Sequence, residues 1–212
     1  RQMIGENYFL RAFCHFSLLR FYAKPYSVDP NAPGVIIRQS TSDAAKKERA
    51  SVKDVYNFVV DDLQKAASLM NSARGPQYAS KAAAWAMLSR VYLYMDKNAE
   101  AIAYADSVIN SGDYSLESSE GFKTYFPNAA NSSETIFLIA FTPADNKGKF
   151  GSIASMLYSD GNSGWGEEFA SKSIRDLMAP NPEDVRWSYI DTLFDDEGNV
   201  ATKNGIEIYY IT

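Results

Sequence analysis

The segment from Ser80 to Gly112 constrains the fold most, because its apolar residues repeat at helical spacing in two successive runs. The first run gathers large side chains on one helix face: Trp85, Leu88, Val91, Tyr92 and Met95. The second starts at Asn98 and forms a similar stripe: Ala101, Ile102, Ala105, Val108 and Ile109. Ser80 is placed to cap the first helix, and Gly112 to end the second. The sequence therefore predicts a helical hairpin over residues 80–112.

This hairpin carries the tetratricopeptide pattern, in which spaced Trp, Leu, small and Tyr positions precede a small residue in the next helix. The matching residues are Trp85, Leu88, Ser89, Tyr92 and Ala101, while the proline that closes such a repeat is missing. The small Ser89 and Ala101 let two helix backbones approach each other closely. The pattern concerns packing, so it predicts a scaffold with outer polar faces open to partners and indicates no chemistry.

A helix is also predicted over residues 4–22, which are apolar nearly all round except for a narrow stripe of Asn7, Arg11 and His15. A helix of this composition is expected to be mostly buried. His15 has Cys14 beside it but no third ligand nearby, so we interpret it as a structural histidine.

The clearest amphipathic helix is predicted over residues 51–70. Ser51 and Asp54 approximate a capping box at its start. Asp61 and Asp62 are consecutive, so their side chains diverge on a helix and are not expected to act together on one substrate. We interpret both as solvated surface acids.

The rest of the chain is richer in loops. Residues 24–49 form a long excursion between the first two helices, and residues 134–141 suggest an extended stretch laid against the helices. Residues 189–194 and 206–211 are interpreted as paired strands. A short helix is predicted over 169–179, with four residues facing inward: Phe169, Ile174, Leu177 and Met178.

Composition argues against several functions. The net charge is −5, with 26 acidic and 21 basic residues dispersed along the chain, so no basic face for nucleic acid is indicated. The chain has one Cys and one His, so it has few residues from which to form a metal site or a Ser-His-Asp triad. The acidic turn at 195–199 lacks EF-hand spacing, so a plain turn is favoured. We therefore predict no catalytic residue, metal or cofactor, although carboxylates brought together from distant loops would still permit a hydrolase.

The candidate binding site lies in the glycine-rich stretch 143–168. Aromatic residues make up 14% of the chain, more than a helical-repeat core needs, so some are expected on the surface. Trp165, between two glycines, is either an exposed platform that stacks on a sugar ring or a plug that folds back onto the helices. The candidate ligand-binding residues are Phe150, Tyr158, Asn162 and Trp165.

Several stretches, in order and spacing, resemble the SusD/RagB-like outer-membrane lipoproteins of Bacteroidetes. They are residues 5–12 leading to 19–22; 49–52 with 55–56 and 62–63; 84–95 with 101–102; 134–137; and Asp184 with Arg186. All are scaffold positions, so no binding residue is carried over from the family.

The resemblance implies a mainly α fold, a tetratricopeptide-like scaffold of helical pairs with long loops and a few short strands. It also implies a non-enzymatic protein that binds an oligosaccharide or polysaccharide at the cell surface and delivers it to a SusC-like TonB-dependent transporter. The chain would be a fragment of one SusD-like domain over 1–212, with helical pairs at 4–70 and 80–112 and a loop-rich extension at 113–212. A lipid anchor outside it would hold the protein at the outer membrane.

The alternative function is a tetratricopeptide-type adaptor for protein–protein interaction. The pattern from Trp85 to Ala101 supports it, and the long excursion at 24–49 argues against it.

Overall fold

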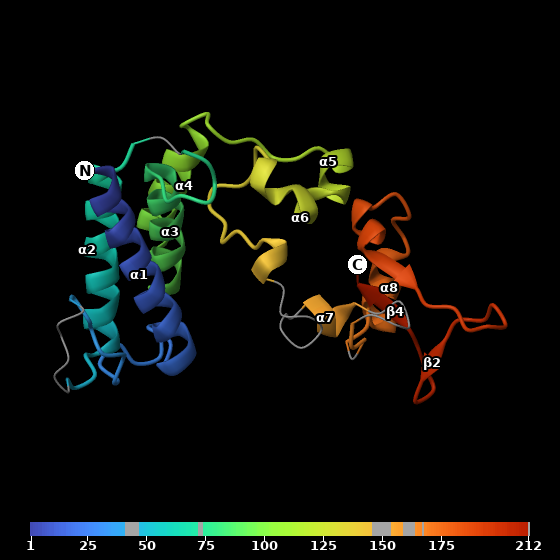
Figure 1. Cartoon of the computed structure of the whole chain (residues 1–212). Helices are drawn as coiled ribbons and strands as arrows, with labels where there is room; N and C mark the ends of the chain where they lie inside the picture. The colour runs from blue at the N-terminus through green and yellow to red at the C-terminus, as the bar shows by residue number, and fades with distance from the viewer. Residues whose placement is uncertain (41–46, 72–73, 146–153, 159–163, 167, 212) are drawn as a thin grey trace. The chain divides into compact units, whose positions relative to one another are not determined.

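The computed structural model describes residues 1–40, 47–71, 74–145, 154–158, 164–166 and 168–211. The chain divides into two compact units (Figure 1). Unit 1 comprises residues 1–116 and 129–139, and unit 2 comprises residues 117–128 and 140–212.

Unit 1 is built from four helices that pack in chain order: α1 (Gln2–Tyr22), α2 (Val52–Leu69), α3 (Lys81–Tyr94) and α4 (Asn98–Ile109). Figure 1 shows α1, α2 and α3 side by side. The four helices predicted from periodicity are therefore confirmed, as is the helical hairpin formed by α3 and α4.

The predicted caps are also present. The Ser51 hydroxyl accepts from the Asp54 N–H at 3.1 Å and donates to the Asp54 carboxylate at 2.7 Å. The Ser80 hydroxyl accepts from the Ala83 N–H at 3.1 Å. Gly112 has φ +71°, the left-handed conformation expected after a helix end. Local side-chain chemistry thus sets these helix boundaries.

The core of unit 1 lies between the helices. Its largest fully buried side chains include Phe9, Phe16, Leu63, Leu88 and Val91. The predicted extended stretch lies against this core, because the Phe137 ring meets the Phe9 ring edge-on at a centroid distance of 5.0 Å.

Two burial predictions for unit 1 are wrong. The helix α1 is buried on one side only, and its other side exposes Met3, Leu10, Leu18, Phe21 and Tyr22. On α4, Ala101 and Val108 are buried but Ile102 and Ile109 are exposed. In the described structure α1 packs mainly on α2, and α4 packs on α3, so each has a partner on one side only.

The prediction that Asp62 is a surface acid is also wrong, whereas Asp61 is exposed as predicted. Asp62 is 1% exposed and forms a bidentate ion pair with Arg11 of α1, with N–O distances of 2.7 and 2.9 Å. This hydrogen bonding raises the pKa of Arg11 above its ordinary value. The pair joins α1 to α2.

His15 is structural, as predicted. It is buried, its Nδ1 lies 2.8 Å from the Arg11 carbonyl oxygen, and its Nε2 accepts from the Arg38 N–H at 3.1 Å. Because Nε2 accepts, Nδ1 carries the proton and donates to Arg11. The imidazole therefore ties the long excursion to α1.

The end of the same excursion is fixed by Arg49. Its guanidinium donates to the carbonyl oxygens of Gly34 at 2.5 Å, Tyr22 at 2.8 Å and Pro33 at 3.1 Å. These bonds hold the chain beyond α1 against the start of α2.

Unit 2 contains short elements: the helices α5 (Ser119–Lys123), α6 (Tyr125–Asn128), α7 (Ala154–Leu157) and α8 (Lys172–Met178), the 3₁₀ helices η2 (Pro143–Asp145) and η4 (Val185–Tyr189), and the strands β1 (Ile190–Thr192), β2 (Thr202–Lys203), β3 (Ile206–Glu207) and β4 (Tyr209–Ile211). Unit 1 also has a 3₁₀ turn, η1 (Ala129–Asn131). The strand β1 pairs antiparallel with β4, and β2 pairs with β3, so the predicted strand pairing is confirmed.

The prediction for α8 is only partly right. Met178 is buried and Phe169 is half-buried, but Ile174 and Leu177 are exposed. In the turn at 195–199, the Asp195 carboxylate accepts from the N–H groups of Glu197 at 3.0 Å and Asn199 at 2.8 Å and so closes the turn. Among the described residues there is no cluster of three His, Cys, Asp or Glu side chains that could hold a metal ion.

No helix in the described part of the chain is long and apolar enough to cross a membrane. The predicted fold class is confirmed: the chain is mainly α, with helical pairs, long loops and a few short strands.

Candidate functional site

Two of the four predicted binding residues, Tyr158 and Trp165, are described, and both belong to unit 2. Phe150 and Asn162 lie outside the described residues. For Tyr158 and Trp165, the structure shows the main-chain hydrogen bonds, the burial and the neighbouring residues.

The main chain around Trp165 is attached to the segment of α7. The Trp165 N–H donates to the Ser155 carbonyl oxygen at 2.6 Å, and the Gly166 N–H donates to that of Tyr158 at 3.2 Å. The Glu168 N–H donates to the Met156 carbonyl oxygen at 3.2 Å. Two short segments therefore hold Tyr158 and Trp165 close in space.

The glycines beside Trp165 are required by this arrangement. Gly164 has φ +73° and Gly166 has φ +54°, a region that residues with a side chain rarely adopt. A Cβ atom on Gly164 would lie 2.1 Å from the Tyr158 carbonyl oxygen. The close approach of the two segments thus depends on glycine at position 164.

Trp165 is 41% exposed, so a large part of the residue faces solvent and the rest is covered. Tyr158 is half-buried, and its ring meets the Tyr210 ring edge-on at a centroid distance of 5.6 Å. The Tyr210 hydroxyl in turn donates to the Asp191 carboxylate at 3.1 Å. The sequence pattern gives no signal for Tyr210, which the pairing of β1 with β4 places opposite Asp191.

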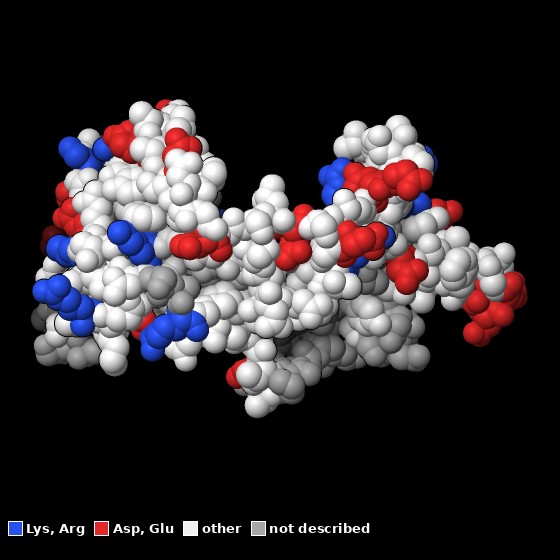
Figure 2. Space-filling view, turned by 90° about the horizontal axis from the view of Figure 1, so that it is seen from above, with Lys and Arg blue, Asp and Glu red and all other residues white. Residues whose placement is uncertain are grey.

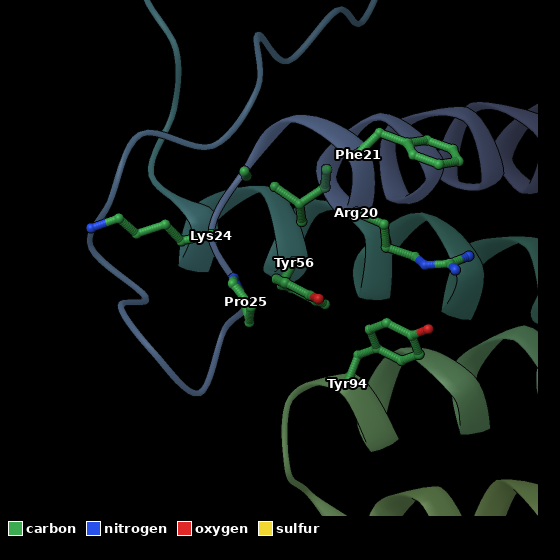
Figure 3. A pocket seen from close by; sticks show the side chains of 8 residues that line it. Arg20, Phe21, Lys24, Pro25, Tyr56 and Tyr94 are labelled. Carbon is green, nitrogen blue, oxygen red and sulfur yellow. The ribbon is translucent and has the colours of Figure 1, made fainter.

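A second candidate site, also missed, lies in unit 1 where α1 ends. It is a pocket of about 250 Å³, which we call the Arg20 pocket, and it is lined by Arg20, Phe21, Lys24, Pro25, Tyr56 and Tyr94 (Figure 3). These residues come from the end of α1 and the turn after it, from α2, and from the end of α3.

The Arg20 guanidinium is held by aromatic rings. Its central carbon lies 5.6 Å from the Phe16 ring centroid and 5.1 Å from the Tyr94 ring centroid. Burial raises the pKa of Tyr56 to about 12, so its hydroxyl stays protonated at neutral pH. The four-residue spacing of Phe16 and Arg20 was the available sequence signal, but it predicts no contact with Tyr94 from a distant helix.

Charged side chains of both signs are interspersed on the face shown in Figure 2, with broad uncharged areas between them. Within unit 1, acidic and basic groups often pair directly, as Arg74 does with Glu6 at 2.7 Å. The described residues on the face shown therefore form no extended area of a single charge.

Comparisons with known proteins agree on one family. Residues 1–93 match the family model SusD-like_3, described as "Starch-binding associating with outer membrane". SusD-like protein P38 from Formosa agariphila is 28% identical over 116 residues, which are 54% of this chain and 22% of that protein.

The fold is shared with solved structures. A SusD superfamily protein from Bacteroides thetaiotaomicron is 28% identical, with a TM-score of 0.78, and the match covers 98% of this chain and 46% of that one. A laminarin-binding SusD-like protein is 24% identical, with a TM-score of 0.70, and the match covers 98% of this chain and 50% of that one. These matches in sequence and in fold bear out the predicted resemblance to SusD-like proteins. The chain spans about half the length of these solved relatives.

Proposed function

We propose that this chain is part of a cell-surface glycan-binding protein of a SusC/SusD-type uptake complex, and that it binds glycan without hydrolysing it. The observation that carries the proposal is the match of residues 1–93 to a family described as starch-binding, together with the SusD superfamily fold over nearly the whole chain. The laminarin-binding relative of the same fold supports a glycan as the ligand.

The partner and the location extend the same proposal. A SusC-like TonB-dependent transporter would receive the glycan, and a lipid anchor outside this chain would hold the protein at the outer membrane. The family description, which includes association with the outer membrane, supports this location. We also propose that units 1 and 2 are parts of one SusD-like domain.

We assign the glycan contact to Trp165, with Tyr158 beside it and Phe150 and Asn162 as further contacts. The exposed part of Trp165 is available to stack on the apolar face of a sugar. The bonds from Trp165 and Gly166 to the α7 segment hold the main chain in place before binding, which lowers the entropy lost when ligand binds. A stacking contact needs no charge, so its strength should change little with salt.

Calorimetric titration with maltohexaose and laminarihexaose tests this assignment. Trp165→Ala should weaken binding by about 1–3 kcal/mol, the usual loss for an aromatic anchor, and leave the melting temperature nearly unchanged. Phe194→Ala is the matched control, because Phe194 is an exposed aromatic residue elsewhere in unit 2 and should bind like the parent.

The opposite pattern would assign Trp165 to the core. If Trp165→Ala lowered the melting temperature strongly and bound both oligosaccharides as the parent does, the glycan site would lie elsewhere. Turnover that survives repurification and is lost on changing a single Asp or Glu would contradict the non-enzymatic part of the proposal.

A further inference from the structure

The Arg20 pocket of unit 1 has the size and lining of a small binding site. At about 250 Å³ it falls just below the roughly 300–1,000 Å³ of pockets for drug-sized ligands, so it suits a single ring rather than a long chain. Pro25 and Phe21 contribute apolar surface, and Tyr56 and Tyr94 contribute both ring surface and hydroxyl groups.

Arg20 is one of the arginines that have no acidic partner in the described part of the chain. Among the described residues, no Asp or Glu carboxylate lies within 4.0 Å of its guanidinium. By contrast, several arginines are paired with acids: Arg11 with Asp62, Arg74 with Glu6, and Arg186 with Asp184. The Arg20 guanidinium therefore keeps its N–H groups available while Phe16 and Tyr94 hold its position.

Hydrogen-bond donors converge beside this cation. Figure 3 shows the hydroxyl groups of Tyr56 and Tyr94 turned to the same side of the pocket as the Arg20 guanidinium. The Lys24 ammonium extends away from them and lies 3.9 Å from the Asp29 carboxylate. A pocket with several donors and no carboxylate close to its arginine favours an anion, and the planar guanidinium matches a carboxylate in two parallel hydrogen bonds.

We propose that the Arg20 pocket binds the carboxylate of a uronic acid residue, with Arg20 pairing the carboxylate and the hydroxyls of Tyr56 and Tyr94 donating to the same sugar. The choice of a sugar acid rests on the proposed glycan-binding function, whereas the choice of a carboxylate rests on the lining of the pocket. This site is separate from the Trp165 site, since its residues belong to unit 1.

Calorimetric titration of the whole chain with tetragalacturonate tests the proposal, with the fully methyl-esterified tetramer as the uncharged counterpart. The parent should bind the acid at least tenfold more tightly than the ester, and its affinity for the acid should fall as salt rises. Arg20→Gln should lose at least tenfold in affinity for the acid.

Two further variants test whether binding depends on the planar donor geometry of Arg20 and on this arginine in particular. Arg20→Lys keeps the charge but loses the planar pair of donors, so it should also bind more weakly than the parent. Arg90→Gln is the matched control, because it removes an exposed arginine of α3 that does not line the pocket, and its affinity should stay within twofold of the parent. Melting temperatures of all variants show whether any loss comes from unfolding.

The proposal is overturned if the ester binds as tightly as the acid, if Arg20→Gln or Arg20→Lys binds like the parent, or if tetragalacturonate does not bind. Titration with laminarihexaose and maltohexaose distinguishes failure of the uronate site from failure of the proposed glycan-binding function. Binding of either neutral oligosaccharide without binding of the acid would leave glycan binding intact and remove the uronate site.

Discussion

At the scale of single residues, the pair formed by Arg11 and Asp62 shows how burial changes the role of an acid. Asp62 is wholly buried, while the side chain of Arg11 is 28% exposed and also donates to the Gln39 carbonyl oxygen at 3.0 Å. A buried ion pair adds little net stability over an apolar pair of similar size, but one that loses a partner leaves a buried charge uncompensated.

Arg11→Met should therefore lower the free energy of unfolding by about 3 kcal/mol. The double variant Arg11→Met with Asp62→Leu should recover part of that loss, because no buried charge remains. Urea unfolding measures each value, and Asp61→Leu serves as a matched control that should change stability by less than about 0.5 kcal/mol, since Asp61 is exposed. A double variant less stable than Arg11→Met alone would contradict this interpretation of the pair.

The roles of single residues were the hardest feature of the structure to predict from the sequence. Helical geometry correctly separates the directions of Asp61 and Asp62, but it does not tell which of the two faces another helix. That depends on how α1 lies against α2, which the sequence pattern does not specify. The Arg20 pocket was missed for the same reason, since Tyr56 and Tyr94 reach it from α2 and α3.

At the scale of elements, the crossing of α3 and α4 tests the packing interpretation of the tetratricopeptide pattern. The Ser89 hydroxyl donates to the Ala101 carbonyl oxygen at 2.8 Å, and Ala101 is buried. The two small residues thus lie where the helix backbones approach, as the sequence predicted.

Ala101→Leu should destabilise the chain by about 1–3 kcal/mol, because the added methylenes have no space at this crossing. Ala103→Leu on the same helix is the matched control, since Ala103 is exposed and the change should be nearly neutral. Thermal unfolding of both variants measures the difference. Equal melting temperatures would mean that the crossing lies elsewhere.

Helices and caps were predictable because they depend on neighbours three or four residues away along the chain. The start of α2 at Ser51 and the start of α3 at Ser80 follow from single hydroxyl groups. Burial was less predictable, because Ile102 fits an apolar stripe and is nevertheless exposed. Periodicity gives the face of a helix, but the number of partners that cover this face is a property of the assembled structure.

At the scale of the whole molecule, the resemblance to SusD-like proteins could be predicted because the signals that carry it are spread from residue 5 to Arg186 and depend on order rather than on any one site. For the candidate binding site, the sequence predicted only a composition, namely aromatic residues among glycines. The structure adds a physical reason for those glycines, since Gly164 must approach the Tyr158 carbonyl oxygen closely. The SusD-like fold is thus established from residues that pack, whereas the glycan contact remains a proposal.

The central claim is that this chain binds glycan through Trp165, and the indole N–H signals of a ¹⁵N-labelled sample test it most directly. The chain has three tryptophans, Trp85, Trp165 and Trp187, and single substitutions assign their three signals. On titration with maltohexaose and laminarihexaose, the account predicts that at least one oligosaccharide shifts the Trp165 signal in a saturable way and leaves those of Trp85 and Trp187 nearly unchanged. The claim is contradicted if the Trp165 signal stays in place with both oligosaccharides, whether or not calorimetry detects binding of either one.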